Sequence, residues 1–197
     1  MKDISGFFFK FYDNGLLRLK TIFCSAFLRL SCCLRGIDIG KNIYSFGHTT
    51  FRRFPNSTIS ISDNCVFRSS VTSNLIGNNR KCILSTLLAG SKIIIGKRCG
   101  FSGTIIGAFK SIEIGNNVRC GANTLITDGD WHFDDPRSGE PKEIIIERNV
   151  WIGEGVKILK GVTIGENTII GTGSVVTRNI PPNVVAAGNP CKVIRPL

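Results

Sequence analysis

A six-residue unit repeats without interruption near the carboxyl end of the chain. Six hexads follow one another from Ile146, with the sequences IERNVW, IGEGVK, ILKGVT, IGENTI, IGTGSV and VTRNIP. An aliphatic residue opens every hexad, and the fifth place holds a small or aliphatic residue. A period of six matches neither the 3.6-residue period of a helix nor the simple alternation of a strand. It is typical of a solenoid, in which stacked coils share one continuous core.

The length of the repeat predicts how the coils stack. Three hexads make one triangular coil of 18 residues, so residues 18 apart in the sequence should lie over one another. The expected pairs are Ile146 with Ile164, Ile152 with Ile170, and Ile158 with Val176.

The same register continues toward the amino end, less regularly. Its earlier hexads are opened by Ile39, Ile61, Phe67, Ile95, Phe101, Ile114, Cys120 and Ile126. Recurring Ile-Gly-x-Asn segments suit corners, because Gly and Asn tolerate the left-handed backbone conformation. Thirteen residues rather than twelve separate Phe101 from Ile114, so one corner should contain an extra residue. We expect an N-terminal helical segment over 1–36, an all-β solenoid over 37–180 and a tail over 181–197.

One interruption of the repeat is much larger. The hexad opened by Ile126 should be followed by another at position 132, but the register resumes at Ile146. Fourteen residues are therefore extruded in or near 128–143, where the sequence is DGDWHFDDPRSGEPKE. This stretch is polar and contains one of the two histidines of the chain. Polar loops on a rigid scaffold often contain functional groups, so we expect the site here.

The candidate for chemistry in this loop is His132. A neutral imidazole has a reference pKa of about 6.5 and can accept a proton near neutral pH. Four aspartates flank it, and Asp130 is our candidate to orient the ring. The alternative is a loop histidine that only makes local hydrogen bonds. His48, near the other end of the solenoid, is expected to be a surface or corner residue.

Charge and cysteine content limit the partners. A formal net charge of +11 and a pI near 9.6 indicate anionic partners, or only a generally basic surface. We find no Lys/Arg stripe or nucleic-acid-binding module, so nucleic acid is disfavoured. Two histidines and no CxxC motif make a metal site unexpected. Cys65, Cys99 and Cys120 occupy buried places of the repeat, which predicts structural thiols in a reducing compartment such as a bacterial cytoplasm.

The segment 16–34 is the one stretch of the sequence that could be mistaken for a targeting segment. Three cations interrupt it, so a transmembrane span is not expected. Its apolar residues recur at steps of four and three, the spacing of an amphipathic helix. These residues are Leu19, Phe23, Ala26, Leu30 and Cys33. The helix is expected either to pack on the solenoid or a neighbouring subunit, or to rest peripherally on an anionic membrane surface.

The carboxyl-terminal sequence resembles a known family. The string NVWIGEGVKILKGVTIGENTIIGTGSVVTRNIPPNVVAAGNPCKVIR is similar to the hexapeptide-repeat acyltransferases of the left-handed β-helix class. Within that class it most resembles the galactoside and maltose acetyltransferases and the capsule and O-antigen O-acetyltransferases. The resemblance is strongest from Ile126 to Arg195. It implies left-handed coiling, a homotrimer, and acetyl-CoA bound in the cleft between adjacent solenoids.

The resemblance also implies roles for particular residues. His132 corresponds to the family's general base, which activates an acceptor hydroxyl for direct attack on the thioester. The residues implied to contact acetyl-CoA are Trp151, Thr172, Thr177, Arg178 and Lys192, with Arg178 and Lys192 at its phosphates. The sequence departs from the galactoside and maltose enzymes around His132, where Asp-Trp-His-Phe replaces their His-Pro, and in the N-terminal region that binds their acceptor. The acceptor therefore stays open.

The leading hypothesis is an acetyl-CoA-dependent O-acetyltransferase acting on a sugar, a surface polysaccharide or its precursor. A xenobiotic acetyltransferase of the streptogramin type and an amino-sugar N-acetyltransferase are alternatives with the same fold. A structural solenoid without catalytic activity is an alternative of a different class. Carbonic anhydrases built on this solenoid need three histidines on one zinc, and the chain has two histidines in total.

Overall fold

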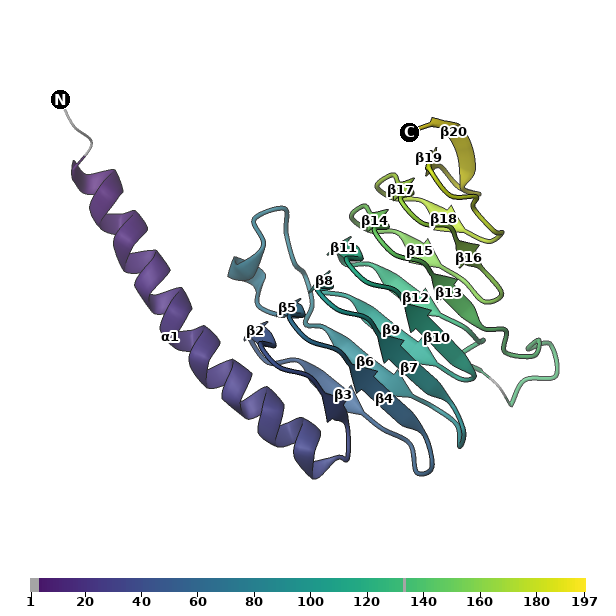
Figure 1. The fold of residues 1–197 in the computed structure, drawn as a ribbon, viewed down its shortest axis with the longest axis horizontal. Helices are drawn as coiled ribbons and strands as arrows, with labels where there is room; N and C mark the ends of the chain where they lie inside the picture. Colours follow the sequence, from purple (N-terminus) through teal and green to yellow (C-terminus); the bar gives the residue numbers. More distant parts are fainter. Residues whose placement is uncertain (1–3, 133) are drawn as a thin grey trace.

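The computed structural model describes residues 4–132 and 134–197, and shows one long helix beside a three-sided stack of parallel strands (Figure 1). The helix α1 spans Ile4–Leu34. Consecutive strands join three sheets in turn, so that each coil adds one strand to each side of a triangular prism. The parallel sheets agree with the expected all-β solenoid.

The three sheets are named A, B and C. Sheet A contains β1 (Asp38–Ile39), β4 (Thr58–Ile61), β7 (Lys92–Ile95), β10 (Ser111–Ile114), β13 (Ile144–Ile146) and β16 (Thr163–Ile164). Sheet B contains β2 (Tyr44–Phe46), β5 (Val66–Arg68), β8 (Gly100–Ser102), β11 (Arg119–Ala122), β14 (Trp151–Ile152), β17 (Ile169–Ile170), β19 (Val184–Ala187) and β20 (Lys192–Pro196). Sheet C contains β3 (Thr50–Arg52), β6 (Ile83–Thr86), β9 (Ile105–Ala108), β12 (Leu125–Thr127), β15 (Lys157–Ile158) and β18 (Val175–Val176). Only β19 and β20 pair antiparallel among the named strands of the described chain.

The core is built mainly from the apolar residues that open the hexads, together with those at the fifth place. The three predicted pairs are confirmed, since Ile146 lies beside Ile164, Ile152 beside Ile170, and Ile158 beside Val176. Earlier coils follow the same rule, and the Phe67 and Phe101 rings stack with their centroids 5.3 Å apart. Stacking buries these side chains almost completely, which is the main stabilising contribution in a fold of this kind.

One corner, between sheets A and B, is marked by a column of asparagines. Asn42, Asn117 and Asn167, from the Ile-Gly-x-Asn segments, have φ between 54° and 59°. The expectation that these segments form corners is therefore confirmed. Their side chains are hydrogen-bonded from coil to coil, for example from Asn149 Nδ2 to Asn167 Oδ1 at 3.0 Å.

Helix α1 packs on the first coil through a different face from the one that we predicted. Thr21, Leu28 and Cys32 are buried against the solenoid, and Ser25 Oγ accepts a hydrogen bond from the Ser45 N–H at 2.9 Å. The predicted packing residues lie on the outer side, where Leu19 is 58%, Phe23 74% and Leu30 57% exposed. Small side chains let the helix lie close to β2, so the bulky apolar face points away. The prediction that this face packs on the chain's own solenoid is wrong.

The amino-terminal half of α1 extends beyond the solenoid (Figure 1). Within the described residues, no helix contains a stretch that is long and apolar enough to cross a membrane.

The buried cysteines are structural, as predicted. Cys65, Cys99 and Cys120 each have an exposed fraction of 4% or less, and all three are free thiols. Burial raises the pKa of the Cys82 and Cys120 thiols, so both stay protonated at neutral pH. These thiols fill small spaces in the core, as uncharged apolar side chains would.

Candidate functional site

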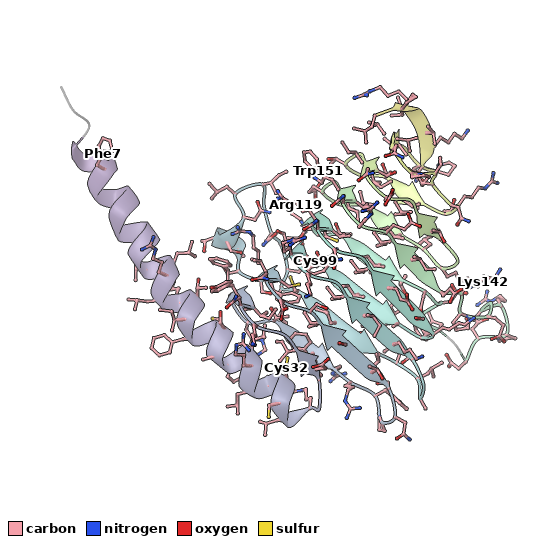
Figure 2. All side chains as sticks on the ribbon, viewed as in Figure 1. Phe7, Cys32, Cys99, Arg119, Lys142 and Trp151 are labelled. Carbon is pink, nitrogen blue, oxygen red and sulfur yellow. The ribbon has the colours of Figure 1, made fainter. Side chains whose placement is uncertain are left out.

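The extruded loop leaves the solenoid at the corner between sheets C and A. It begins directly after Thr127, the last residue of β12, and ends at Ile144, the first residue of β13. Residues 128–143 thus lie between these two strands. It projects from one side of the prism, where Figure 2 labels Lys142.

Asp128 fixes the start of the loop. Its fully buried carboxylate accepts the backbone N–H groups of Phe109 at 2.6 Å, Lys110 at 2.8 Å and Ser111 at 2.6 Å. These three residues form the corner between β9 and β10, one coil earlier. Burial raises the pKa of the Asp128 carboxyl more than the three donors lower it. Because Asp128 has no access to solvent, we interpret it as an anchor and not as a base.

Trp131 provides a second anchor through its ring. A Cβ atom built on Gly107 would come within 2.6 Å of the Trp131 ring, so only glycine allows this approach. The ring also meets Phe109 edge to face, with the centroids 5.7 Å apart. The residue directly before His132 is thus packed against the solenoid.

Asp130 contacts a lysine that the sequence analysis did not identify. Its Oδ2 atom accepts hydrogen bonds from Lys160 Nζ at 2.6 Å and from the Gly139 N–H at 2.9 Å. The ammonium of Lys160, followed by the Gly139 N–H, lowers the pKa of the Asp130 carboxyl. Lys160 belongs to the hexad ILKGVT, at the same corner of the next coil, and this register was the signal that could have found it. Asp130 therefore fastens the loop to the solenoid.

His132 lies exposed on this anchored loop. Its backbone oxygen accepts hydrogen bonds from the Asp135 N–H at 3.0 Å and from Ser138 Oγ. In residues 4–132 and 134–197, no side chain is hydrogen-bonded to the imidazole. The ring is therefore open to solvent, while the backbone oxygen is held by two residues that follow His132 in the loop. His48, as expected, is an exposed corner residue whose ring lies 5.1 Å from that of Phe27.

The five residues expected at a cofactor are exposed but dispersed. Thr177 and Arg178 follow β18 at the C–A corner, the same corner that carries the His132 loop. Thr172 follows β17 at the corner between sheets B and C. Trp151 and Lys192 lie on sheet B, in β14 and β20.

Sheet B is the side of the prism opposite the C–A corner, because a triangular coil has one corner facing each side. Figure 2 shows Trp151 and the loop residue Lys142 on different sides of the molecule. A single chain therefore brings His132 near the corner of Thr177 and Arg178, but not near Trp151 or Lys192.

A second loop was missed by the sequence analysis. Residues 69–82 leave the corner between β5 and β6 and contain a short 3-10 helix, Val71–Ser73. Leu75 is 98% exposed, and Asn78 Nδ2 donates to the Arg68 oxygen at 2.9 Å. The gap in the register between Phe67 and Ile95 was the available signal. The loop projects from the solenoid near β5 and β8 (Figure 1).

Known proteins resemble this chain in sequence and in fold. Residues 143–178 match the family model "Bacterial transferase hexapeptide (six repeats)". The galactoside O-acetyltransferase of Escherichia coli (strain K12) is 46% identical over 112 residues, which cover 54% of this chain and 55% of that protein. A putative acetyltransferase of Schizosaccharomyces pombe is 43% identical over 110 residues, or 51% of its length. The chain thus spans about half the length of the curated relatives it matches.

Solved structures extend the likeness to nearly the whole chain. A maltose O-acetyltransferase from Clostridium difficile 630 has a TM-score of 0.52 and 27% identity, and the match covers 92% of this chain and 88% of that one. An N-acyltransferase from Bacillus cereus, solved with dTDP and 3-hydroxybutyryl-CoA, has a TM-score of 0.65 over 85% of this chain and 87% of that one. At 18% identity, this second likeness shows a shared fold alone. The chain therefore carries the bacterial transferase hexapeptide repeat and resembles, in sequence and in fold, acetyltransferases that are built on it.

Proposed function

We propose that this protein is an acetyl-CoA-dependent O-acetyltransferase that acts on a hydroxyl of a sugar, a surface polysaccharide or its precursor. The observation that carries the proposal is an exposed histidine on a loop that is anchored at three points to a hexapeptide solenoid. Sequence similarity to a galactoside O-acetyltransferase supports acetyl transfer to a sugar, as does structural similarity to a maltose O-acetyltransferase.

The proposed chemistry is a direct transfer with His132 as general base. The imidazole takes the proton of the acceptor hydroxyl while its oxygen attacks the thioester carbonyl of acetyl-CoA. The tetrahedral intermediate collapses as the carbon–sulfur bond breaks, and the leaving thiolate takes up a proton. A backbone N–H or a polar side chain beside the carbonyl stabilises the oxyanion. Asp130 contributes by holding the loop through Lys160, so that the imidazole stays in place.

The proposed enzyme is a homotrimer whose site is shared between neighbouring chains. His132 and Trp151 lie on opposite sides of one chain, so they can form one site only if the loop of one subunit faces sheet B of the next. Cyclic association repeats this heterologous contact three times. The solenoid is proposed to coil left-handedly, as in the family that the sequence resembles.

Acetyl-CoA is proposed to lie in this cleft along the last coils. Arg178 and Lys192 are exposed cations that suit its phosphates, and Thr172 and Thr177 offer hydroxyl groups nearby. Trp151, 58% exposed, offers a flat apolar surface to the pantetheine arm.

The test of this function is an acceptor screen with acetyl-CoA, in which the free thiol of CoA is measured. We expect thiol release that depends on both enzyme and a saccharide hydroxyl, with an acetyl ester as the product. A chain that binds neither CoA nor acetyl-CoA in calorimetry would contradict the proposal. An acetylated amine in place of an ester would assign the chain to N-acetyl transfer.

For α1 we propose peripheral contact with an anionic membrane surface from the cytoplasmic side. The outward face contains Ile22, Phe23, Phe27 and Leu30, all at least half exposed. The segment 16–34 has three cations and no acidic residue, which matches the negative headgroups of such a surface. This placement would bring the enzyme to lipid-linked acceptors.

A double substitution tests the membrane contact. Phe23→Ser with Phe27→Ser is expected to lower binding to phosphatidylglycerol vesicles by about tenfold or more, because each buried phenyl ring contributes about 1.5–3 kcal/mol. Co-sedimentation measures this effect, and phosphatidylcholine vesicles control for charge. Unchanged binding would contradict the proposal. Loss of the oligomer in the double variant would instead place this face between subunits.

A further inference from the structure

A cationic groove runs along sheet B on the amino-terminal side of Trp151. One hollow of about 360 Å³ is lined by residues that include Arg68, Arg98 and Arg119. A second, of about 450 Å³, is lined by Arg98, Arg119 and Trp151 together with Asn117 and Asn149. Arg119 pairs with Trp151 across neighbouring strands, and Figure 2 shows both side chains at the same side of the prism. Among the described residues, none that lines either hollow is acidic.

Arg98 is the exception in the asparagine column at the A–B corner. Its equivalents in the other coils are Asn42, Asn64, Asn117, Asn149, Asn167 and Asn183, all with φ between 54° and 62°. Arg98 has a φ of 59°, in the left-handed region that asparagine adopts far more readily than arginine. Its Nε atom donates to Asn117 Oδ1 at 2.7 Å, which replaces one rung of the column. A backbone conformation that disfavours the residue present is a common mark of a functional position.

The arginines of the groove have no counter-charge among the residues that the structure describes. In the described residues, none of Arg68, Arg98 and Arg119 forms an ion pair. Arg68 is held by the Ser73 oxygen of the 69–82 loop at 2.9 Å and by the Phe46 ring, with its guanidinium carbon 4.8 Å from the ring centroid. Arg119 is exposed, and its guanidinium group has no hydrogen-bond partner within 4–132 and 134–197. Guanidinium groups gathered in this way suit a carboxylate or a phosphate, which they bind with paired N–H donors.

The three arginines of the groove lie on the other side of Trp151 from the remaining proposed cofactor contacts. Thr172, Thr177, Arg178 and Lys192 all follow Trp151 in the solenoid, toward the last coil, whereas the three arginines precede it. A cofactor that uses the later coils leaves the earlier ones for the acceptor. Trp151, the proposed contact for the pantetheine arm, lies between the two and also lines the second hollow.

We propose that this groove binds an acidic saccharide, whose carboxylate or phosphate is held by Arg98 and Arg119, and that this saccharide is the acceptor of the reaction. The inference rests on the proposed acetyl transfer, and it adds the class of acceptor. The net charge of +11 increases the local concentration of such an acceptor.

The test measures saccharide binding without acetyl-CoA, so it does not depend on whether transfer occurs. Ligand-observed NMR titrations compare glucuronic acid, glucose 1-phosphate and glucose with the wild-type oligomer. At least one acidic sugar should bind about tenfold or more tightly than glucose, because charge-assisted hydrogen bonds are roughly twice as strong as neutral ones. The acidic sugar that binds distinguishes a carboxylate from a phosphate acceptor. Arg119→Gln should lower that affinity by about tenfold.

Arg98→Asn is the more informative variant, because it restores the residue found at this corner in every other coil. This variant should bind the acidic sugar more weakly. Its midpoint of thermal unfolding should rise by about 2–4 °C, since asparagine relieves the strained backbone. Arg52→Gln removes the same charge from sheet C and should change neither quantity.

Equal binding of acidic and neutral sugars would overturn the proposal, as would an Arg119→Gln variant with unchanged affinity. If the arginine variants bound CoA more weakly but bound the acidic sugar as the wild type does, the groove would belong to the cofactor. That result would also overturn the proposal.

Discussion

Replacing His132 with alanine is expected to lower the turnover of acetyl transfer by about 10²–10⁴-fold, the usual contribution of a general base. The imidazole is exposed, and no side chain of the described residues is hydrogen-bonded to it, so its removal disturbs no packing. The fold and the oligomer should therefore persist. The measurement is thiol release from acetyl-CoA with a saturating acceptor, beside circular dichroism and sedimentation of the same sample.

Asp134→Ala is the matched control for this variant. Asp134 is exposed on the same loop, two residues further along, and is expected to keep turnover within about twofold of wild type, as a surface substitution does. An active His132→Ala variant would show that another group accepts the proton. Equal losses in both variants would show that loop disturbance, and not a missing base, explains the effect.

Replacing Asp128 with alanine is expected to destabilise the protein and to lower its activity together. Three backbone N–H groups lose the acceptor that they share, and each unsatisfied buried donor costs about 1–3 kcal/mol. Lys110 is exposed and Ser111 is partly exposed, so water can satisfy some of the freed N–H groups, and we expect a loss of about 2–4 kcal/mol. The loop then loses its first anchor, and turnover should fall by about tenfold because the base is misplaced.

Thermal unfolding and turnover of the same samples measure both effects. The Asp128→Asn variant keeps one carbonyl oxygen as an acceptor. Its stability and its turnover should both lie between those of Asp128→Ala and those of the wild type. Unchanged turnover in a destabilised Asp128→Ala protein would mean that the anchor serves the fold and not the site.

Much of the fold could be predicted because the repeat has a single period. Each hexad opens with a residue that is buried only in one register, so Ile146, Ile152 and Ile158 determine the stacking of the last coils. The interruption after Ile126 is visible against that regularity, and the loop could be placed at 128–143 for the same reason. Asparagine at the A–B corner follows from its tolerance of positive φ.

The remaining features depend on contacts between coils that the sequence pattern does not encode. The face that α1 presents to the solenoid depends on the close fit of small residues to β2, whereas apolar periodicity favours the bulky face. The pair of Asp130 with Lys160 joins residues thirty positions apart, at a corner shared by successive coils. Arg98 differs from the repeat by one residue, and its significance appears only beside the asparagines of the other coils.

The central claim is that His132 and Trp151 form one site between two chains, and mixed oligomers test it most directly. Trp151→Ala should weaken acetyl-CoA binding at every site, and His132→Ala should inactivate every site. When the two variants are co-expressed in equal amounts, about a quarter of the sites combine the intact loop of one chain with the intact Trp151 of its neighbour, as expected for random association in a ring. Activity at low acetyl-CoA should then return to about a quarter of wild type, well above both parents. A mixture no more active than the mean of its two parents would show that each chain builds its site alone, and would contradict the account.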